Sequence, residues 1–108
     1  MTILRGGDST KIVIDHSYAE FVLSDEAWKQ YGKGKPEDVN SVIFRTDLDL
    51  IRVVEQLGGK ASGRSYWGQM AELEIVEVPD GIPVRIENYD GNEWVAEEHR
   101  TWGKAEKM

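Results

Sequence analysis

Short apolar segments alternate with polar turns along the first part of the chain, a pattern typical of strands joined by loops. Residues 11–15 (KIVID) are rich in β-branched side chains, which predicts a first strand. Residues 20–23 (EFVL) follow a short polar segment and are predicted to pair with that strand as a hairpin. A third apolar stretch, residues 42–44, is also expected to be extended. The lead-in at residues 1–10 is expected to be mobile.

A short helix is predicted at residues 25–31. Ser24 precedes it and is a favoured N-cap residue, and the acidic first turn suits the positive end of the helix dipole. Leu23 and Trp28 have the spacing of a hydrophobic staple across this cap. Gly32 follows the last helical position and is expected to end the helix.

The main helix is predicted at residues 47–57, where apolar residues recur with the period of an α-helix. Its apolar stripe consists of Leu50, Ile51, Val54 and Leu57. Asp47 is the expected N-cap, and Gly58 follows the last apolar position as a stop signal. The stripe favours packing of this helix across a sheet.

Beyond residue 70 the apolar pattern has a period of two, which predicts strands. Residues 71–78 form the first of them, but the alternation slips at residues 76–78. The slip indicates either a β-bulge or a strand end that is apolar on both faces. Residues 79–81 (PDG) are a strong turn signal, and residues 82–86 resume the alternation as the next strand.

A second hairpin signal lies at Asp90 and Gly91. Residues 93–99 then form either a third strand or a short helix, and we favour the strand because a hairpin turn needs a partner. The tail at residues 103–108 is charged and is expected to be mobile.

These elements predict an α+β fold. We expect an antiparallel sheet of four to five strands, with the helix at 47–57 packed on one face and the short helix at 25–31 beside it. A chain of 108 residues is expected to form a single domain, residues 1–108.

Composition narrows the class of protein. The absence of Cys excludes disulfides, thiol nucleophiles and Cys-ligated zinc sites. A hydrophobic content of 40% indicates a globular chain rather than a disordered one, even though 31% of the residues are charged. Because no apolar run reaches the ~18 residues of a membrane span, we expect no membrane association and a cytoplasmic location.

Charge is concentrated in residues 71–98, which hold nine carboxylates against the single cation Arg85, a net charge of −8. The whole chain carries −7, so this block sets the electrostatics of the protein. An acidic surface attracts basic partners and repels nucleic acid, so we expect no direct binding of DNA or RNA. The alternative is a solvated sheet face that only keeps the protein soluble.

Catalytic and metal-binding chemistry are weakly indicated. Glu72 with Glu74, or Glu93 with Glu97, could pair for acid–base work, but carboxylates at period two are usually the solvated face of a strand. The two histidines, His16 and His99, lack the spacing of metal ligands, so Glu93, Glu97 and His99 make a poor metal cluster. We therefore expect a non-enzymatic protein with no metal and no cofactor.

A loop with several glycines at residues 58–69 contains a candidate anion site. Its polar and aromatic candidates are Lys60, Arg64, Tyr66 and Trp67, with Arg45 as a further cation. The loop matches neither of the glycine-rich nucleotide-binding motifs, so no particular nucleotide is indicated. A flexible connection is the alternative interpretation.

The acidic block contains a candidate protein-binding surface. Its predicted residues are Glu72, Glu74, Glu87, Glu93, Trp94 and Glu97, which combine carboxylates with an aromatic anchor. Such a surface is expected to dock onto a basic protein, including one that normally binds nucleic acid.

Residues 45–102 also resemble a group of small, uncharacterised proteins encoded by bacteriophages and prophages. The resemblance is carried by Arg45 and Asp47, Val53-Val54-Glu55-x-Leu57-Gly58, Ala61-Ser62-Gly63, Ile75-Val76-Glu77-x-Pro79-Asp80, Tyr89-Asp90-Gly91 and His99-Arg100-Thr101-Trp102. It implies a phage origin, hence location in the host cell cytoplasm, and no defined activity.

Two functions follow as expectations. The first is a phage-encoded acidic protein that binds and inhibits a basic host factor, with anti-CRISPR action as one specific form. The second is a small-molecule binder that sequesters a nucleotide or another anion through the loop from Lys60 to Trp67.

Overall fold

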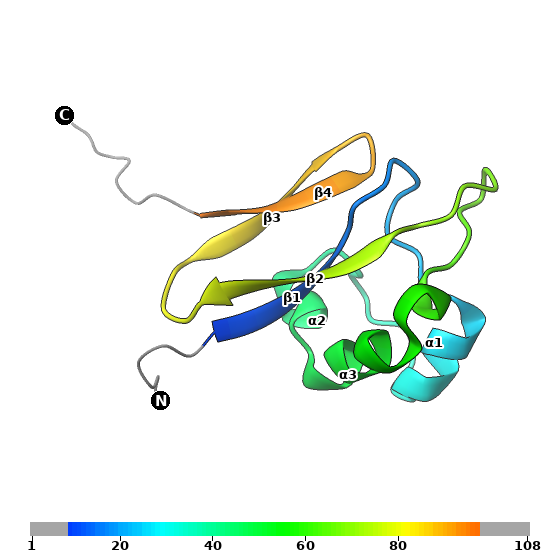
Figure 1. Ribbon diagram of the computed structural model, residues 1–108, viewed down its shortest axis with the longest axis horizontal. Coiled ribbons are helices and arrows are strands. Elements are labelled where there is room, and N and C mark those ends of the chain that lie inside the picture. The colour runs from blue at the N-terminus through cyan, green and yellow to red at the C-terminus, as the bar shows by residue number, and fades with distance from the viewer. Residues whose placement is uncertain (1–8, 98–108) are drawn as a thin grey trace.

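The computed structural model describes residues 9–97 of the chain (Figure 1). Its elements, in chain order, are β1 (Ser9–Asp15), α1 (Asp25–Tyr31), α2 (Val42–Arg45), α3 (Leu48–Leu57), the 3-10 turn η1 (Gly58–Ala61), β2 (Leu73–Pro79), β3 (Val84–Tyr89) and β4 (Asn92–Glu97). All strand pairs are antiparallel, and the helices lie together on one side. The predicted α+β class is confirmed.

The four strands form two two-stranded ladders, β1–β2 and β3–β4, instead of one continuous sheet. In the first ladder Ser9 pairs with Pro79 and Asp15 with Leu73, and in the second Val84 pairs with Glu97. The two ladders are joined by the turn after Pro79, and β1 contacts β4. The chain thus turns a corner between β2 and β3.

Strand β1 lies in the middle layer of the molecule, between the helices and the β3–β4 hairpin (Figure 1). Its side chain at Val13 belongs to the core shared with the helices. Ile12 and Ile14 point to the opposite side of the ladder, yet they are only 0% and 3% exposed. Both faces of β1 are therefore buried.

The helix-side core contains three aromatic rings around Phe44. Phe21 and Tyr31 meet this ring edge to face, with centroids 6.1 and 5.6 Å away, and Trp28 stacks on it at 5.9 Å. Such pairs add about 0.5–1.5 kcal/mol each beyond the burial of their area. They fix α1 and α2 to the segment that follows β1.

Helices α1 and α3 begin where the sequence predicts. Ser24 Oγ accepts a hydrogen bond from the amide of Ala27, and the Asp47 carboxylate accepts one from the amide of Asp49. Gly32 adopts the left-handed conformation at the end of α1. In α3 the buried face includes three of the four predicted stripe residues, Leu50, Ile51 and Val54, together with Val53.

Two sequence predictions for short extended segments are wrong. Residues 42–44 lie in helix α2, because Ser41 Oγ accepts a hydrogen bond from the amide of Phe44 and so caps a short helix. Residues 20–23 form no strand and do not pair with β1, whose partner is β2. Glu20 has a positive φ of 93°, which interrupts the extended backbone.

The pairing of β1 with β2 settles the slip predicted at residues 76–78. The register runs without interruption from Ser9 to Asp15, so the ladder contains no bulge. Ile75 packs on the helix-side core, while Val76 pairs with buried Ile12 and points to the other side. The bulge is therefore excluded; Ile75 and Val76 place apolar side chains on both faces, but Glu77, on the face of Ile75, is exposed.

The remaining boundaries concern the ends of the described chain. Residues 92–97 form strand β4 as favoured, whereas 98–99 lie outside the described residues. Ser9 and Thr10, which were expected in a mobile lead-in, are the first residues of β1. The expectations for residues 1–8 and 103–108 fall outside the described residues.

Candidate functional site

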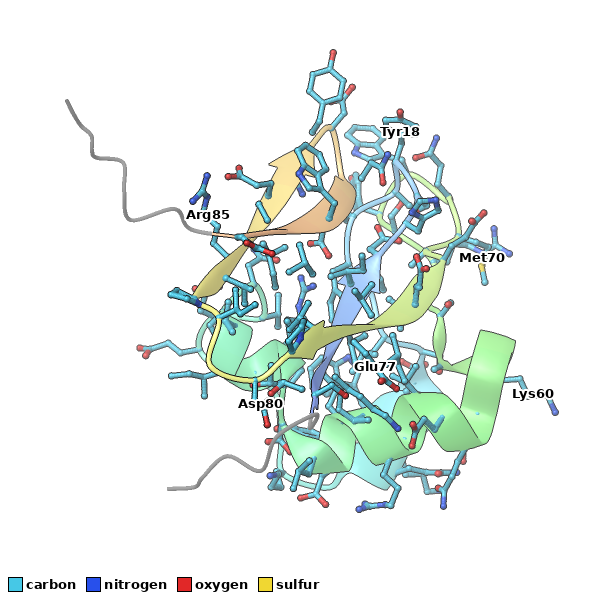
Figure 2. The ribbon with its side chains drawn as sticks, turned by 60° about the vertical axis from the view of Figure 1, so that its left-hand side comes forward. Tyr18, Lys60, Met70, Glu77, Asp80 and Arg85 are labelled. Atoms are coloured by element: carbon cyan, nitrogen blue, oxygen red, sulfur yellow. The ribbon has the colours of Figure 1, made fainter. Side chains whose placement is uncertain are left out.

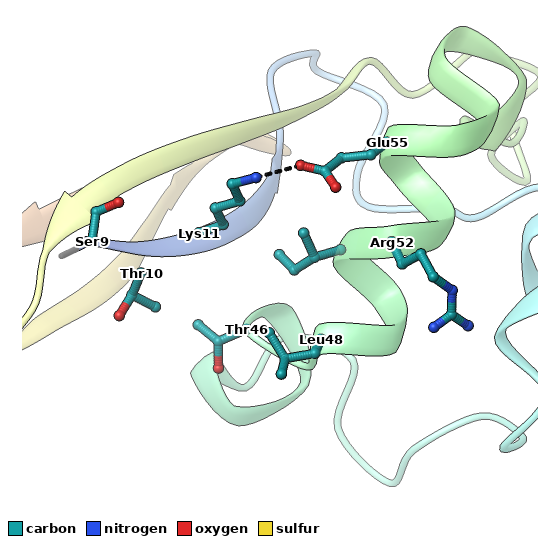
Figure 3. Close-up of a pocket in the computed structure, with 8 residues that line it drawn as sticks. Ser9, Thr10, Lys11, Thr46, Leu48, Arg52 and Glu55 are labelled. Carbon is teal, nitrogen blue, oxygen red and sulfur yellow. Dashed lines mark hydrogen bonds and ion pairs between the residues drawn. The ribbon is translucent and has the colours of Figure 1, made fainter. Parts of the chain in front are cut away.

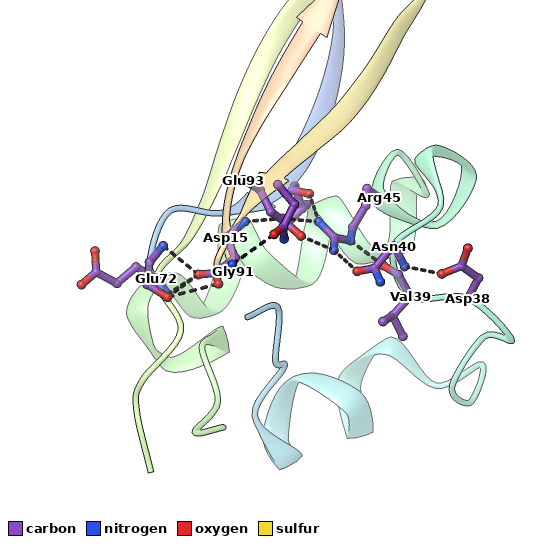
Figure 4. Close-up of polar contacts among 11 residues, drawn as sticks. Asp15, Asp38, Val39, Asn40, Arg45, Glu72, Gly91 and Glu93 are labelled. Carbon is purple, nitrogen blue, oxygen red and sulfur yellow. Dashed lines mark hydrogen bonds and ion pairs between the residues drawn. The ribbon is translucent and has the colours of Figure 1, made fainter. Parts of the chain in front are cut away.

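A fully buried arginine lies at the junction of the helices and the two ladders (Figure 4). The Arg45 guanidinium donates from Nε to Val39 O (2.5 Å), from Nη1 to Val13 O (3.1 Å) and Glu93 Oε1 (2.7 Å), and from Nη2 to Asn40 Oδ1 (2.9 Å) and Glu93 Oε2 (2.9 Å). A guanidinium has five N–H donors, and these five hydrogen bonds give each of them an acceptor.

The acceptors continue into a buried polar network. Glu93 Oε1 also accepts a hydrogen bond from the amide of Asp15 at 2.8 Å, and the Asp15 carboxylate accepts from Glu72 N and from Ser17. Burial raises the pKa of the Asp15 carboxyl, and the hydrogen bonds from Glu72 and Ser17 oppose that shift. The Phe21 ring covers the guanidinium carbon at 3.6 Å.

This network corrects two predictions about site residues. Glu93 is 3% exposed and bound to Arg45, so it does not belong to a protein-binding surface. Arg45 is 0% exposed, so it is not an additional cation for the loop that follows α3. The alternation of side chains along the strand gave a hint of this burial, because Glu93 lies on the same face as Val95 and on the opposite face from Trp94. The network joins β4 to β1 and α2.

Among residues 9–97, the most exposed aromatic side chains are at the tip of the turn before β2. Tyr66 is 88% exposed and Trp67 81%, and their rings meet edge to face at 5.0 Å. The turn is closed by a bridge between Arg64 and Met70. Two large rings held in solvent by a closed turn are typical of protein-binding surfaces.

Beside this turn lies a shallow groove between two loops. It is lined by Ser17, Tyr18, Ala19, Gln69, Met70 and Glu72. Tyr18 is 62% exposed and Met70 44%, and Figure 2 shows both at the same end of the molecule. We call Tyr18, Tyr66, Trp67, Met70, Glu72 and Glu74 the loop-end surface.

Close packing holds the Tyr18 loop in place against the β3–β4 turn. A Cβ atom at Gly91 would lie 2.8 Å from Tyr18 O, so only glycine fits there. Sequence reasoning missed Tyr18 and Met70, since neither belongs to a motif and only the tertiary structure brings their loops together.

The predicted acidic surface is divided among three places. Glu72 is exposed just before β2 and lines the groove, and Glu74 is exposed in β2 beside His16. Glu87 and Trp94 are paired across the β3–β4 ladder, and Arg85 forms an ion pair with Glu87. Glu97 is opposite Val84 at the far end of that hairpin. Only Glu72 and Glu74 share a surface with exposed aromatic residues of the loop end.

The candidate anion-binding residues do not converge either. Arg64 Nη1 donates to Gly68 O at 2.7 Å within its own turn. Lys60 belongs to η1, where its carbonyl accepts a hydrogen bond from Ser24 Oγ, and its side chain points outward in Figure 2. Tyr66 and Trp67 pack on each other. The loop therefore forms no clamp of cations and rings around a common point.

Residues 9–97 contain no group of three side chains placed to hold a metal ion. His16 Nδ1 is 3.6 Å from Glu74 Oε1, and Glu93 is bound by Arg45. His99, the third member of the cluster considered from the sequence, lies outside the described residues.

Comparison of the chain with protein-family models, with curated proteins and with solved structures found no match. The resemblance of residues 45–102 to small phage proteins therefore stays a prediction. Within the described part of the chain, no helix has the length and apolar character needed to cross a bilayer.

Proposed function

We propose that this chain is a non-enzymatic acidic protein that binds a basic protein of a phage host and inhibits it. The observation that carries the proposal is the loop-end surface, where Tyr66 and Trp67 stand in solvent beside a groove that contains Tyr18 and Glu72. Aromatic side chains of this kind supply most of the binding energy in protein interfaces, and nearby carboxylates select a basic partner.

Charge supports the same class of partner. The net charge of −7 produces a field that speeds the approach of a basic protein and opposes contact with DNA or RNA. A basic nucleic-acid-binding effector is the partner this field favours. The resemblance to phage proteins adds the host context, in which inhibition of a defence nuclease of the CRISPR type is one specific form.

The proposal is tested with purified nucleic-acid-binding effectors from candidate hosts, including CRISPR nucleases. Binding is measured by biolayer interferometry at low and high salt, and inhibition by cleavage of a labelled DNA substrate. We expect binding that weakens as salt rises, because exposed charges are screened within about 10 Å at 0.1 M salt. Salt-independent binding contradicts an acidic contact surface.

A matched pair of charge reversals locates the surface. Glu74→Lys and Glu37→Lys change the net charge equally, but only Glu74 lies on the loop-end surface, while Glu37 is exposed in the loop after α1. We expect Glu74→Lys to weaken binding by at least about tenfold and Glu37→Lys to have a small effect. Equal effects of the two variants contradict the assignment of the surface.

A further inference from the structure

The hydrogen-bond parity of the β1–β2 ladder shows which backbone groups of β2 face outward. His16 N donates to Glu72 O at 2.8 Å. The even-numbered residues of the two strands, which are paired with one another, therefore form the backbone hydrogen bonds of the ladder. The backbone N–H and C=O groups of Glu74, Val76 and Val78 therefore point to β1. Those of Leu73, Ile75 and Glu77 point to the opposite edge.

On β1 the outward groups at the end next to Asp15 have side-chain partners. Val13 O accepts from Arg45, and Asp15 N donates to Glu93, so the buried network covers this part of the edge. On β2 the amide of Leu73 donates to Ser62 Oγ at 3.1 Å. In residues 9–97 the outward groups of Ile75 and Glu77 have no hydrogen-bond partner. A segment of open strand edge is thus left in the middle of β2.

Pro79 is consistent with this parity. It is paired with Ser9, and odd-numbered residues of β2 direct their backbone groups outward. The absence of an N–H at Pro79 therefore removes no hydrogen bond from the ladder. A proline is tolerated in a strand when its nitrogen faces away from the neighbouring strand. The sequence of β2 is therefore that of an edge strand.

The burial of the two paired strands agrees with an open edge on β2. Ile12, Val13 and Ile14 of β1 are 0–3% exposed, whereas their partners on β2, Val76 and Ile75, are only half-buried and Glu74 is exposed. Figure 3 shows β2 as the outer strand of the ladder, with β1 between it and the start of α3.

We propose that the open edge of β2 binds an extended segment of the basic partner as an additional strand. The proposal rests on the function proposed above and names how that partner is held. Strand addition supplies affinity through backbone hydrogen bonds and specificity through alternate side chains. The donors and acceptors here are the outward groups of Ile75 and Glu77.

The side chains of β2 specify the chemistry of the added strand. Along the open segment Glu74 and Val76 share one face of the strand, and Ile75 and Glu77 share the other. Each face of this segment thus carries a carboxylate, so an added strand that alternates basic and apolar residues presents its cations to one carboxylate and its apolar side chains to the opposite face. A lysine- or arginine-bearing β-strand is therefore the expected occupant.

A second copy of this chain fits the same edge poorly. Two β2 strands would bring Glu72, Glu74 and Glu77 of each copy to one small sheet, and like charges in neighbouring strands are destabilising. The acidic strand favours a basic occupant instead.

The test uses a short, acetylated, fluorescent peptide of alternating lysine and valine. Three further peptides serve as comparisons: the same peptide N-methylated on alternate residues in each of the two phases, and a glutamate–valine peptide. Fluorescence anisotropy with the full chain is expected to show binding of the lysine–valine peptide. One N-methylated phase and the glutamate–valine peptide are expected to bind at least about tenfold more weakly.

A matched pair of protein variants tests the edge itself. Glu77→Pro and Glu77→Ala both remove the carboxylate and with it the hydrogen bond from Ser9 Oγ, but only the proline removes the outward N–H, and neither removes a backbone hydrogen bond to β1. We expect Glu77→Pro to bind the lysine–valine peptide about tenfold more weakly than Glu77→Ala. Amide resonances of Ile75 and Glu77 in the unmodified protein are expected to shift when the peptide is added.

The outcomes separate this proposal from the proposed function. Lysine–valine binding that neither N-methylated phase weakens, or that shifts only the resonances near Trp67, overturns strand addition and leaves the acidic partner-binding function standing. Equal binding of the glutamate–valine peptide, or no binding of the lysine–valine peptide, overturns the basic occupant. A dimer of the protein alone that Glu77→Pro disperses in sedimentation assigns the edge to a second copy and also overturns the proposal.

Discussion

Arg45 and Glu93 are 48 residues apart in the chain and meet in a buried two-point ion pair, with nitrogen–oxygen distances of 2.7 and 2.9 Å. Removing one partner leaves the other charge buried and unpaired. We therefore expect Glu93→Ala to lower the free energy of unfolding by about 3–5 kcal/mol, measured by urea denaturation. The matched surface pair is Arg85 and Glu87, and Glu87→Ala is expected to cost no more than about 1 kcal/mol.

A double variant distinguishes loss of the pair from loss of packing. Arg45→Met combined with Glu93→Leu removes both charges, so no unpaired charge stays buried. We expect the double variant to be more stable than Glu93→Ala alone. A double variant that is less stable would show that the hydrogen bonds to Val13, Val39 and Asn40 contribute more than the unpaired charge costs.

Gly91 joins the β3–β4 turn to the loop after β1. Its φ is +95°, and an added Cβ would lie 2.8 Å from Tyr18 O, so Gly91→Ala meets both backbone strain and a clash. Gly34 has a φ of +79° but nothing within 4 Å of an added Cβ, so Gly34→Ala meets strain alone. We expect Gly34→Ala to cost about 1 kcal/mol and Gly91→Ala clearly more, by thermal or urea unfolding.

Asp47 caps α3 and also links it to α1. Its carboxylate accepts hydrogen bonds from Asp49 N, Tyr31 OH and Lys33 Nζ. We expect Asp47→Ala to destabilise the protein by about 1–2 kcal/mol, as measured by urea unfolding. Asp47→Asn keeps a capping oxygen and is expected to lose less. Equal losses for the two variants would assign the effect to the ion pair rather than the cap.

Acid stability is expected to depend on the same cluster. Burial opposes ionisation of Asp47, but the bonds from Lys33, Asp49 N and Tyr31 outweigh it and lower its pKa; Arg52 and Lys33 lower the pKa of Asp49. A lowered folded pKa stabilises the protein above the unfolded value of about 3.9. This stability is lost as pH falls through the folded pKa.

Replacing the shared cation tests this dependence. Lys33 lies 2.8 Å from Asp47 and 3.0 Å from Asp49, so Lys33→Gln is expected to bring both pKa values back toward normal. Urea denaturation between about pH 5 and 2 should then show a shallower loss of stability than the unmodified protein. Lys29→Gln, on the exposed side of α1, is the control and is expected to leave the slope unchanged.

Trp67 is expected to matter for binding and not for stability. Its side chain is 81% exposed, so Trp67→Ala should change the free energy of unfolding by no more than about 0.5 kcal/mol. The same variant should lose binding to the host effector in the interferometry assay. Trp28, which stacks on Phe44, is the contrasting residue, and Trp28→Ala should destabilise the fold.

Local patterns determined much of the secondary structure. The caps at Ser24 and Asp47, the apolar stripe of α3 and the turn at Asp90 depend on residues only a few positions apart, so the sequence contains their whole cause. The cap at Ser41 was equally local, but the apolar run after it is as compatible with a strand as with a helix.

Tertiary structure alone decided which strands pair and which charges are buried. Loop residues 20–23 carry strand-like side chains, yet β1 pairs with β2, whose first residue comes 58 positions after the last of β1. In the sequence Glu93 does not differ from the other carboxylates of the strands. Only in the folded chain does Arg45 of α2 donate hydrogen bonds to both of its carboxylate oxygens. The open edge of β2 likewise depends on which neighbours its backbone groups find.

The sequence by itself therefore determined the α+β class, the two longer helices and an acidic C-terminal half. The tertiary structure decided that this acidity is split among a buried network, a hairpin and the loop-end surface. The physical reason is that capping and periodicity are interactions between near neighbours. Burial and strand pairing depend on free energies shared by segments that only the folded chain brings together.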